Sequence, residues 1–320
     1  MKQHSSRELG FMPEFDVSKS VVIRHPEKNA PGYWVGAPSA LVLGNSIYLT
    51  YRIRRPRGEG RGVINRIAIS DDGISFRDEF EIEKSALGNS PSIERSCLVP
   101  IASGFRLYFS YVNPATNVWQ IDMMEAPSVK SFDTASRKNV LTADAAGASG
   151  VKDPYIVTMG NFYLMYVSYA PLPQTAVSGL HATADAFATG LTTSNSGLAI
   201  SADGVNFRWA GEVIGLGKGW DSSTTRISSV ARTPWGFVSF YDGSASMEEN
   251  YEERCGIAIT SDLKHFLRLS TEAPSLLGEG GRSVRYVDPV MLGGKLIYYF
   301  ETTRADGSHE LRAQPCDVES

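Results

Sequence analysis

The residue best suited to catalysis is Asp153, which stands at the head of an apolar, strand-like segment, residues 151–157. A Gly-Asn pair follows at 160–161, and residues 162–168 then form a second strand-like run rich in aromatic and β-branched side chains. This order predicts a β-hairpin. Because burying an unpaired carboxylate is costly, Asp153 suits a cavity better than a dry core. The alternative is that Asp153 braces a turn beside Pro154.

Charged residues also begin other strand-like segments that resemble this one. The charged heads are Glu94 with Arg95, Lys152 with Asp153, Arg226, and Arg285 with Asp288, whereas the uncharged Ala37 heads the first segment. Two carboxylates at a cleft suit the cleavage of a glycosidic bond, because one can protonate the leaving oxygen while the other activates water. Converging heads would therefore make a site for a polar ligand.

Two other interpretations of these charges stay open. In the first, three carboxylates pair with three arginines and plug the centre of the fold: Glu94, Asp153 and Asp288 with Arg95, Arg226 and Arg285. In the second, the same arginines clamp a carboxylate or phosphate of the ligand, because a guanidinium offers paired donors to such oxygens. The ligand would then be a uronic acid or a phosphorylated sugar, or inorganic phosphate would be a second substrate.

The Asp153 hairpin belongs to a unit that recurs five times along the chain. Each copy has a first strand, a Gly-containing turn, an aromatic second strand and a third strand. Five such units predict an all-β fold, a single five-bladed β-propeller over residues 1–320. The blades are expected at residues 35–80, 94–135, 151–210, 224–268 and 283–316. In a propeller the first strands line the central channel, so the charged heads would converge on the axis.

The fifth copy lacks its outer strand, whereas residues 17–24 form a strand-like piece without a partner. We expect this N-terminal strand, within residues 15–25, to complete the last blade and close the ring, which removes a free sheet edge. Deleting residues 1–24 should then destabilise the whole domain. An unchanged melting temperature would refute this closure.

Turns of the form Ser/Thr-x-Asp end the third strands of several copies. They contain Gly73, Gly204 and Leu263, and an aromatic residue follows three places later in each. Glycine suits such a tight turn because it accepts a positive φ. We expect the aromatic residues to pack between neighbouring blades: Phe76, Phe207 and Phe266.

Composition limits the possible partners. The formal net charge of −4 gives no electrostatic reason to expect nucleic acid or an anionic membrane. The first eight residues lack the apolar stretch of a secretory signal, so we expect a soluble, cytoplasmic protein. The three cysteines, Cys97, Cys255 and Cys316, and the five histidines show no metal-ligand spacing. We therefore expect reduced thiols, no metal and no cofactor.

Several of these segments resemble the five-bladed glycoside hydrolase superfamily, in particular the family 130 mannoside phosphorylases and hydrolases. The similarity lies in residues 150–155 followed by 163–166, and it extends to residues 48–52, 67–76 and 235–243. It is thin in each motif but spans most of residues 35–313. The same short patterns also suit families 43, 32 and 117.

The resemblance implies that Asp153 is the general acid and that Arg52, Arg95, Tyr241 and Asp242 surround the substrate. Family 130 has an acid before its Asp-Pro and an arginine after it, where this chain has Lys152 and Tyr155. It usually has a histidine where Asp242 stands. These departures weaken the case for a phosphate site. Family 43 would want an aspartate at the first-blade head, where Ala37 stands, and a glutamate heading the fourth blade, so its three-acid set is absent.

Two loops outside these motifs also contain candidate ligand-binding residues. Asp221 and Trp220 lie in a Gly-rich loop, and Trp220 or Trp34 could stack on a sugar face, although an aromatic in such a loop is as often a packing anchor. The long segment 171–191 is either a lid over the channel mouth or an elongated loop. Its His181 and Asp185 receive no role from the sequence.

The sequence thus favours a glycoside-active enzyme, more an inverting hydrolase than a phosphorylase, with Asp153 as acid and Glu94 or Asp288 as base or modulator. The expected substrate-binding residues are Arg52, Arg95, Lys152, Arg226, Tyr241, Asp242, Arg285 and Trp220. One alternative is a phosphate-dependent phosphorylase. Another is a propeller that binds a sugar or acidic metabolite without cleaving it. A lyase or transferase that re-uses the pocket is a weaker one.

Overall fold

The computed structural model describes residues 12–175 and 177–318, and these residues form an all-β structure, as predicted. Every helix among them is a 3-10 helix of three or four residues. The strands are β1 (Val21–Arg24), β2 (Trp34–Leu43), β3 (Ser46–Arg54), β4 (Gly62–Ser70), β5 (Arg77–Glu83), β6 (Ile93–Ile101), β7 (Gly104–Asn113), β8 (Val118–Ala126), β9 (Lys138–Leu141), β10 (Ala148–Met159), β11 (Phe162–Pro171), β12 (Asn195–Ser201), β13 (Arg208–Ile214), β14 (Thr224–Thr233), β15 (Gly236–Ser244), β16 (Arg254–Thr260), β17 (Leu267–Arg268), β18 (Val284–Leu292), β19 (Lys295–Thr303) and β20 (His309–Asp317). The helices are η1 (Val17–Lys19), η2 (Arg57–Glu59), η3 (Lys84–Leu87), η4 (Thr134–Ser136), η5 (Asp144–Ala146), η6 (Ala186–Ala188) and η7 (Glu279–Gly281).

The strands are grouped into antiparallel units that follow the chain order. Three four-stranded sheets run β6 to β9, β10 to β13 and β14 to β17. A larger sheet joins β18, β19 and β20 to β2, β3, β4 and β5. Within the described residues, the strand pairing between its two halves is limited to Trp34 of β2 and His309 of β20, so we treat β18 to β20 and β2 to β5 as separate units. The predicted Asp153 hairpin is confirmed as β10 and β11, which pair over their length.

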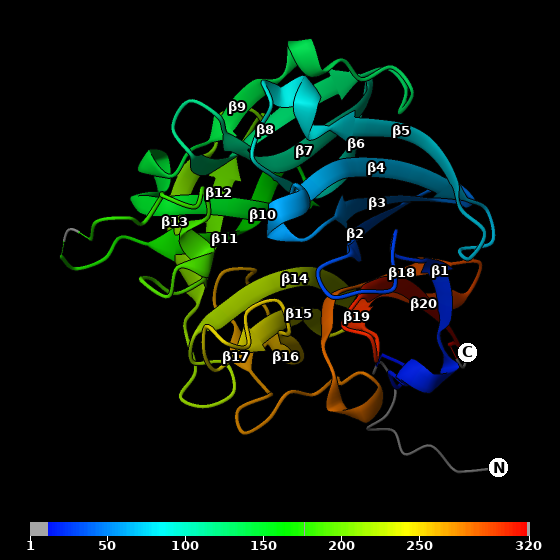
Figure 1. Cartoon of the computed structure of the whole chain (residues 1–320). Helices are drawn as coiled ribbons and strands as arrows, with labels where there is room; N and C mark the ends of the chain where they lie inside the picture. The colour runs from blue at the N-terminus through cyan, green and yellow to red at the C-terminus, as the bar shows by residue number, and fades with distance from the viewer. Residues whose placement is uncertain (1–11, 176, 319–320) are drawn as a thin grey trace.

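The first strands of the units meet around one centre. Strand β2 contacts β6, β6 contacts β10, β10 contacts β14, β14 contacts β18, and β18 contacts β2 again. Figure 1 shows β2, β10 and β14 on the inner side of their units, with the later strands of these units farther out. The N-terminal ends of the first strands therefore come from distant parts of the chain and lie near one another.

The N-terminal segment differs in part from the predicted strand over residues 17–24. Residues Val17–Lys19 form η1, because Asp16 caps it by accepting a hydrogen bond from the Ser18 amide at 3.0 Å. The strand proper, β1, pairs with β20 in antiparallel register. The N-terminal strand thus lies against the last strand of the chain.

The Ser/Thr-x-Asp turns connect neighbouring units. In the first, Ser70 Oγ donates to Asp72, and the amide of Gly73 donates to Ser70 Oγ at 2.9 Å. Gly73 has a φ of 78°, which explains the glycine. The Gly73 carbonyl accepts a hydrogen bond of 2.7 Å from Tyr299 of another unit, and Phe76 packs edge-on against the same ring.

This arrangement repeats in the third and fourth units. Tyr108 donates to the Gly204 carbonyl, and Tyr166 donates to the Leu263 carbonyl, each at 2.7 Å. Phe207 and Phe266 pack edge-on against these two tyrosine rings. The prediction that these aromatic residues pack between neighbouring units is therefore confirmed.

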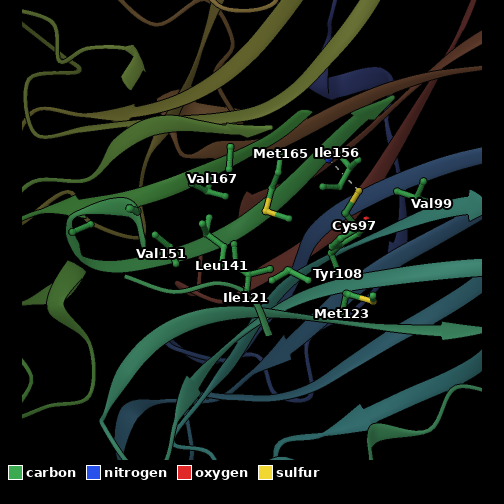
Figure 2. Close-up of a cluster of buried hydrophobic side chains, with 14 residues drawn as sticks. Cys97, Val99, Tyr108, Ile121, Met123, Leu141, Val151, Ile156, Met165 and Val167 are labelled. Carbon is green, nitrogen blue, oxygen red and sulfur yellow. Dashed lines mark hydrogen bonds between the residues drawn. The ribbon is translucent and has the colours of Figure 1, made fainter. Parts of the chain in front are cut away.

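Apolar side chains fill the spaces between successive units. Figure 2 shows one such cluster, which lies between the sheet of β6 to β9 and the sheet of β10 to β13. Its members from the two sides include Cys97, Val99, Tyr108, Ile121 and Met123, and Val151, Ile156, Met165 and Val167. Similar clusters lie between the other neighbours. The core is thus divided into layers, which leaves the centre free for polar residues.

Candidate functional site

Bulges direct the head residues of the first strands. The pairing register shifts between Gly36 and Ser39 in β2, and at the corresponding places in β6, β10, β14 and β18. A bulge adds a residue to one strand and re-aims its side chain. At three of these bulges a residue has a left-handed backbone: Ala37 with a φ of 51°, Asp153 with 57° and Tyr286 with 55°.

Charged side chains from these heads and from the facing strands form one buried group, which we name the charged cluster. Its members are Arg52, Arg54, Glu94, Lys152, Asp153, Arg226, Asp242, Glu253, Arg285 and Glu301. None of them is more than 7% exposed. Charges at this depth must be compensated, and the cluster does so by alternating cations and anions.

At one end of the cluster, Glu94 is held by two arginines. Its carboxylate accepts a hydrogen bond of 2.6 Å from Arg52 Nε and another from Arg54. Burial alone would raise the pKa of Glu94, but the charges of Arg52 and Arg54 outweigh it and lower the pKa to about 2. Glu94 is therefore ionised at neutral pH. Each of its oxygens accepts one hydrogen bond from an arginine and keeps a lone pair that can accept from water.

Glu301 is the next anion in this alternating series of cations and anions. It is fully buried, pairs with Arg285 at 2.6 Å and with Arg52 at 3.2 Å, and accepts a hydrogen bond from the Ala37 amide at 2.9 Å. The chain passes this carboxylate at Gly36, where any Cβ would collide with it. A glycine is thus required beside Glu301.

The other end of the cluster holds Arg226. Its guanidinium pairs with Asp242 at 2.8 Å and lies 3.5 Å from Glu253, which also pairs with Arg285 at 2.6 Å. Burial raises the pKa of Asp242, although Arg226 opposes this. The Tyr286 ring lies 4.0 Å from the Arg226 guanidinium carbon. This end is therefore also held by several contacts.

Asp153 is different from the other acids of the cluster. It is fully buried, yet neither carboxylate oxygen has a hydrogen-bond partner among residues 12–175 and 177–318. Its nearest opposite charges are Arg226 at 3.6 Å and Lys152 at 3.8 Å, both longer than a direct hydrogen bond. Because buried polar atoms nearly always have a partner, these oxygens are expected to bind something other than the protein.

Donor groups near the centre share this property. Arg52 Nη1, Arg95 Nη1 and Trp34 Nε1 are buried and have no hydrogen-bond partner within the described part of the chain. The Arg52 guanidinium carbon lies 5.8 Å from the Trp34 ring. The cluster therefore offers both free acceptors and free donors.

Two predicted residues, Arg95 and Asp288, lie beside the cluster with partners of their own. Arg95 donates twice to the Pro38 carbonyl, and Asp288 accepts hydrogen bonds from the Ala40 amide at 2.8 Å and the Tyr155 hydroxyl at 3.2 Å. Arg95 thus has a backbone carbonyl as its hydrogen-bond acceptor, in contrast to the carboxylate partner of the ion-paired interpretation. Burial raises the pKa of Asp288 to about 6.

Replacing Asp288 by asparagine is expected to stabilise the protein above pH 6 and to change little near pH 4. Because the folded pKa lies above the ordinary value of 3.8, the contribution of Asp288 to stability is full below that value and is lost as the pH rises through 6. A rise from 3.8 to about 6 corresponds to roughly 3 kcal/mol of unfolding free energy. Urea denaturation at both pH values measures it.

The matched control for this substitution is Asp144→Asn, because Asp144 is exposed in η5. As an exposed surface substitution it should change the unfolding free energy by less than about 0.5 kcal/mol. An Asp288→Asn protein that is destabilised to the same extent at pH 4 and pH 8 would contradict the assignment of a raised pKa.

Two predicted ligand residues, Tyr241 and Trp220, lie away from the charged cluster. They pack in the apolar layer between β10 to β13 and β14 to β17. Trp220 Nε1 donates to the Ser270 carbonyl, and the Tyr241 hydroxyl donates to Asp221, which also pairs with Arg268 at 2.7 Å. The structure therefore supports the packing-anchor interpretation of Trp220 and gives Asp221 a partner outside the cluster.

The structure also adds residues that sequence reasoning missed. Glu253 and Glu301 complete the alternation, and Tyr286 lies over Arg226. Trp34 is stacked on His309, with ring centroids 4.5 Å apart, so its ring already has a partner. Glu301 could have been found from the sequence, because it is a charged residue directly after the apolar run 296–300. In the sheet it pairs with Arg285 at the head of β18.

The remaining predictions concern the cysteines, a metal site and a membrane-spanning or secretory segment. Cys97 and Cys255 are buried free thiols, and Cys316 is a half-buried one. Within residues 12–175 and 177–318 no group of three or more metal-ligating side chains occurs. The helices in the same residues are too short and polar to span a bilayer. The expectation of no secretory signal rests on the first eight residues, which include His4 and lie outside the described residues.

No protein-family model and no curated protein sequence matches the chain. Solved structures of similar fold include a glycoside hydrolase, with a TM-score of 0.70 and 11% identity over 94% of this chain and 92% of that one. A β-1,2-mannobiose phosphorylase from Listeria innocua, in complex with β-1,2-mannobiose, matches with a TM-score of 0.59 and 15% identity over 90% of each chain. A thermostable family-43 glycoside hydrolase matches with 0.61 and 12% over 89% and 90%. The chain therefore has the fold of the propeller glycoside hydrolases, as its resemblance to them predicted.

Proposed function

We propose that the protein is a glycoside-active enzyme, an inverting hydrolase in which Asp153 is the general acid. The observation that carries the proposal is that neither Asp153 oxygen has a hydrogen bond within the described residues, whereas every other carboxylate of the cluster accepts hydrogen bonds. A general acid must reach the leaving oxygen of the substrate, so its own oxygens must be free of protein donors.

The free groups around Asp153 fit a ligand with many hydroxyls. A sugar hydroxyl can donate to Asp153 and accept from Arg52 Nη1 or Trp34 Nε1, so one ligand can satisfy both kinds of free group. A purely acidic or purely basic ligand would satisfy only one kind. The substrate in this proposal is a neutral carbohydrate.

For the second carboxylate we propose Glu94 in preference to Asp288. Glu94 lies at the head of β6 within the cluster, and the charge of Lys152, the neighbour of Asp153, contributes to its lowered pKa. Asp288 contacts Ala40 and Tyr155 instead. In an inverting enzyme this residue activates water, which requires a separation from the acid of about 6.5–9.5 Å. Inversion predicts that proton NMR detects the opposite anomer first.

The charges support hydrolysis over phosphorolysis. Arg52, Arg54, Arg226 and Arg285 are each paired with a carboxylate of the cluster. A phosphate would have to compete with these internal anions for the same donors. One observation favours the phosphorylase alternative, namely the free Nη1 groups of Arg52 and Arg95, which could take a phosphate oxygen.

The fold comparison supports a carbohydrate ligand in general terms. The similar structures carry the names glycoside hydrolase and mannobiose phosphorylase, and one of them holds β-1,2-mannobiose. For the architecture we propose five blades, one for each first strand of the central ring, with β1 closing the ring on β20. The pairing of β1 with β20 supports this closure.

The test is an assay of the protein with a panel of aryl glycosides and short oligosaccharides, each with and without inorganic phosphate. Phosphate-independent release of free sugar is the expected result. Turnover only with phosphate would replace the hydrolase by the phosphorylase. Saturable binding of a sugar without turnover would replace the enzyme by a binding protein.

A further inference from the structure

We propose that residues 180–194 form a strap over the charged cluster and that Asp185 is the latch that holds this strap closed. A ligand would then reach Asp153 only when the latch opens. The inference rests on the proposed function in one respect, since it takes the charged cluster as the ligand site. The strap lies between β11 and β12, in the long segment for which the sequence allowed either a lid or a loop.

Asp185 ties the strap to three separate units. Its carboxylate accepts hydrogen bonds of 3.1 Å from Trp119 Nε1 in β8 and from the hydroxyl of Tyr251, which precedes β16. It also pairs with Arg61, which precedes β4, at 3.1 Å. Asp185 is only 2% exposed. One side chain of the strap thus joins elements from the first, second and fourth units.

The strap lies next to the head of β10. The Phe187 ring is 4.7 Å from Lys152 Nζ, and the Trp119 ring, which Asp185 holds, is 5.5 Å from the same atom. Phe187 also packs on Gly150, where an added Cβ would approach within 3.1 Å of the ring. The strap therefore covers the residues that immediately precede Asp153.

Other contacts hold the strap, chiefly at its C-terminal end. Ser194 forms a β-bridge with Thr224, the Thr192 hydroxyl donates to the Pro171 carbonyl at 2.7 Å, and Asn250 Nδ2 donates to the Phe187 carbonyl at 3.4 Å. Arg61 Nη1 donates to the Thr183 and Ala184 carbonyls at 3.1 and 3.0 Å, and Leu180, Ala186 and Phe187 belong to a small apolar cluster. Asp185 is the one acidic residue of the strap. Arg61 Nε and Nη2 have no hydrogen-bond partner among the residues described, so the nearby Asp185 carboxylate is the charge that compensates this arginine. Loss of that carboxylate leaves a buried cation unpaired, which weakens the closed position.

The test is hydrogen–deuterium exchange with mass spectrometry on the full chain, without any ligand. In Asp185→Ala the amides of residues 180–194 and 148–155 should exchange faster by roughly tenfold or more, because local opening becomes easier. The turn at residues 201–207 should not change. Asp144→Asn is the matched control and should leave all these segments as in the parent protein.

Three outcomes would overturn the inference. Unchanged exchange of the strap in Asp185→Ala would show that Asp185 is no latch, and faster exchange of the strap alone would show that the strap does not cover β10. Should the alanine variant fail to fold, Tyr251→Phe removes only one hydrogen bond of Asp185. That variant should raise exchange in the same two segments by a smaller factor, and no rise would be decisive against the latch. Because exchange needs no substrate, a protein that cleaves no glycoside would refute the proposed function and leave this result intact.

Discussion

Replacing Asp153 by asparagine is expected to lower glycoside turnover by roughly 10²- to 10⁴-fold, the usual contribution of a general acid. Asparagine has nearly the same size but cannot deliver the proton. Asp153 has a φ of 57°, and asparagine tolerates this left-handed backbone better than most residues, so the fold should persist. Initial rates on a natural disaccharide and thermal unfolding of the same sample measure both expectations.

A second readout separates proton donation from a structural role of Asp153. An aryl glycoside of a strongly acidic phenol releases its phenolate without protonation by the enzyme. The Asp153→Asn variant should therefore retain far more activity on such substrates than on the disaccharide. A uniform loss on both substrates would indicate a distorted site. Full activity on the disaccharide would end the assignment of Asp153.

Asp288→Asn is the matched control for the Asp153 experiment. Asp288 is also fully buried near the centre, but Ala40 and Tyr155 already occupy its oxygens. Turnover of this variant should stay near that of the parent protein. A loss equal to that of Asp153→Asn would return Asp288 to the catalytic pair.

The hairpins and their order could be predicted from the sequence because their signals are local. Apolar alternation and the turn at residues 160–161 lie within one stretch of chain, as do the turns that contain Gly73 and Gly204. Residue 17 shows the limit of such reasoning, since Asp16 caps a 3-10 turn there and the strand begins later. Local propensity alone could not choose between strand and turn at that place.

The charged heads were also predictable, but their partners were not. The sequence shows Glu94 and Asp153 at strand heads, yet it cannot show that Glu94 binds Arg52 and Arg54 while Asp153 stays without a hydrogen bond. These contacts join residues about 40 positions apart, and they depend on how the units are arranged around the centre. The packing of Trp220 against Tyr241 was not predictable for the same reason, because it depends on tertiary structure.

Replacing Glu301 by glutamine is expected to lower the free energy of unfolding by about 3–5 kcal/mol, the usual effect of removing one partner from a buried ionic group. Glu301 is fully buried and holds Arg285, Arg52 and His309. The amide nitrogen of glutamine would face one of these donors and leave it unsatisfied. Chemical denaturation at pH 7 measures the loss.

The control for Glu301 is Glu252→Gln, because Glu252 contacts the other nitrogen of His309 but its side chain is 44% exposed. A partly solvated pair of this kind contributes less than about 1 kcal/mol. The pH dependence gives a further check. Burial alone would raise the pKa of Glu301, but Arg285 and Arg52 hold it well below the ordinary value of 4.5, so its contribution is present above that value and is lost as the pH falls. The difference between the parent protein and Glu301→Gln should therefore be full at pH 7 and shrink in acid, whereas equal losses for the two glutamates would refute the central place of Glu301 in the cluster.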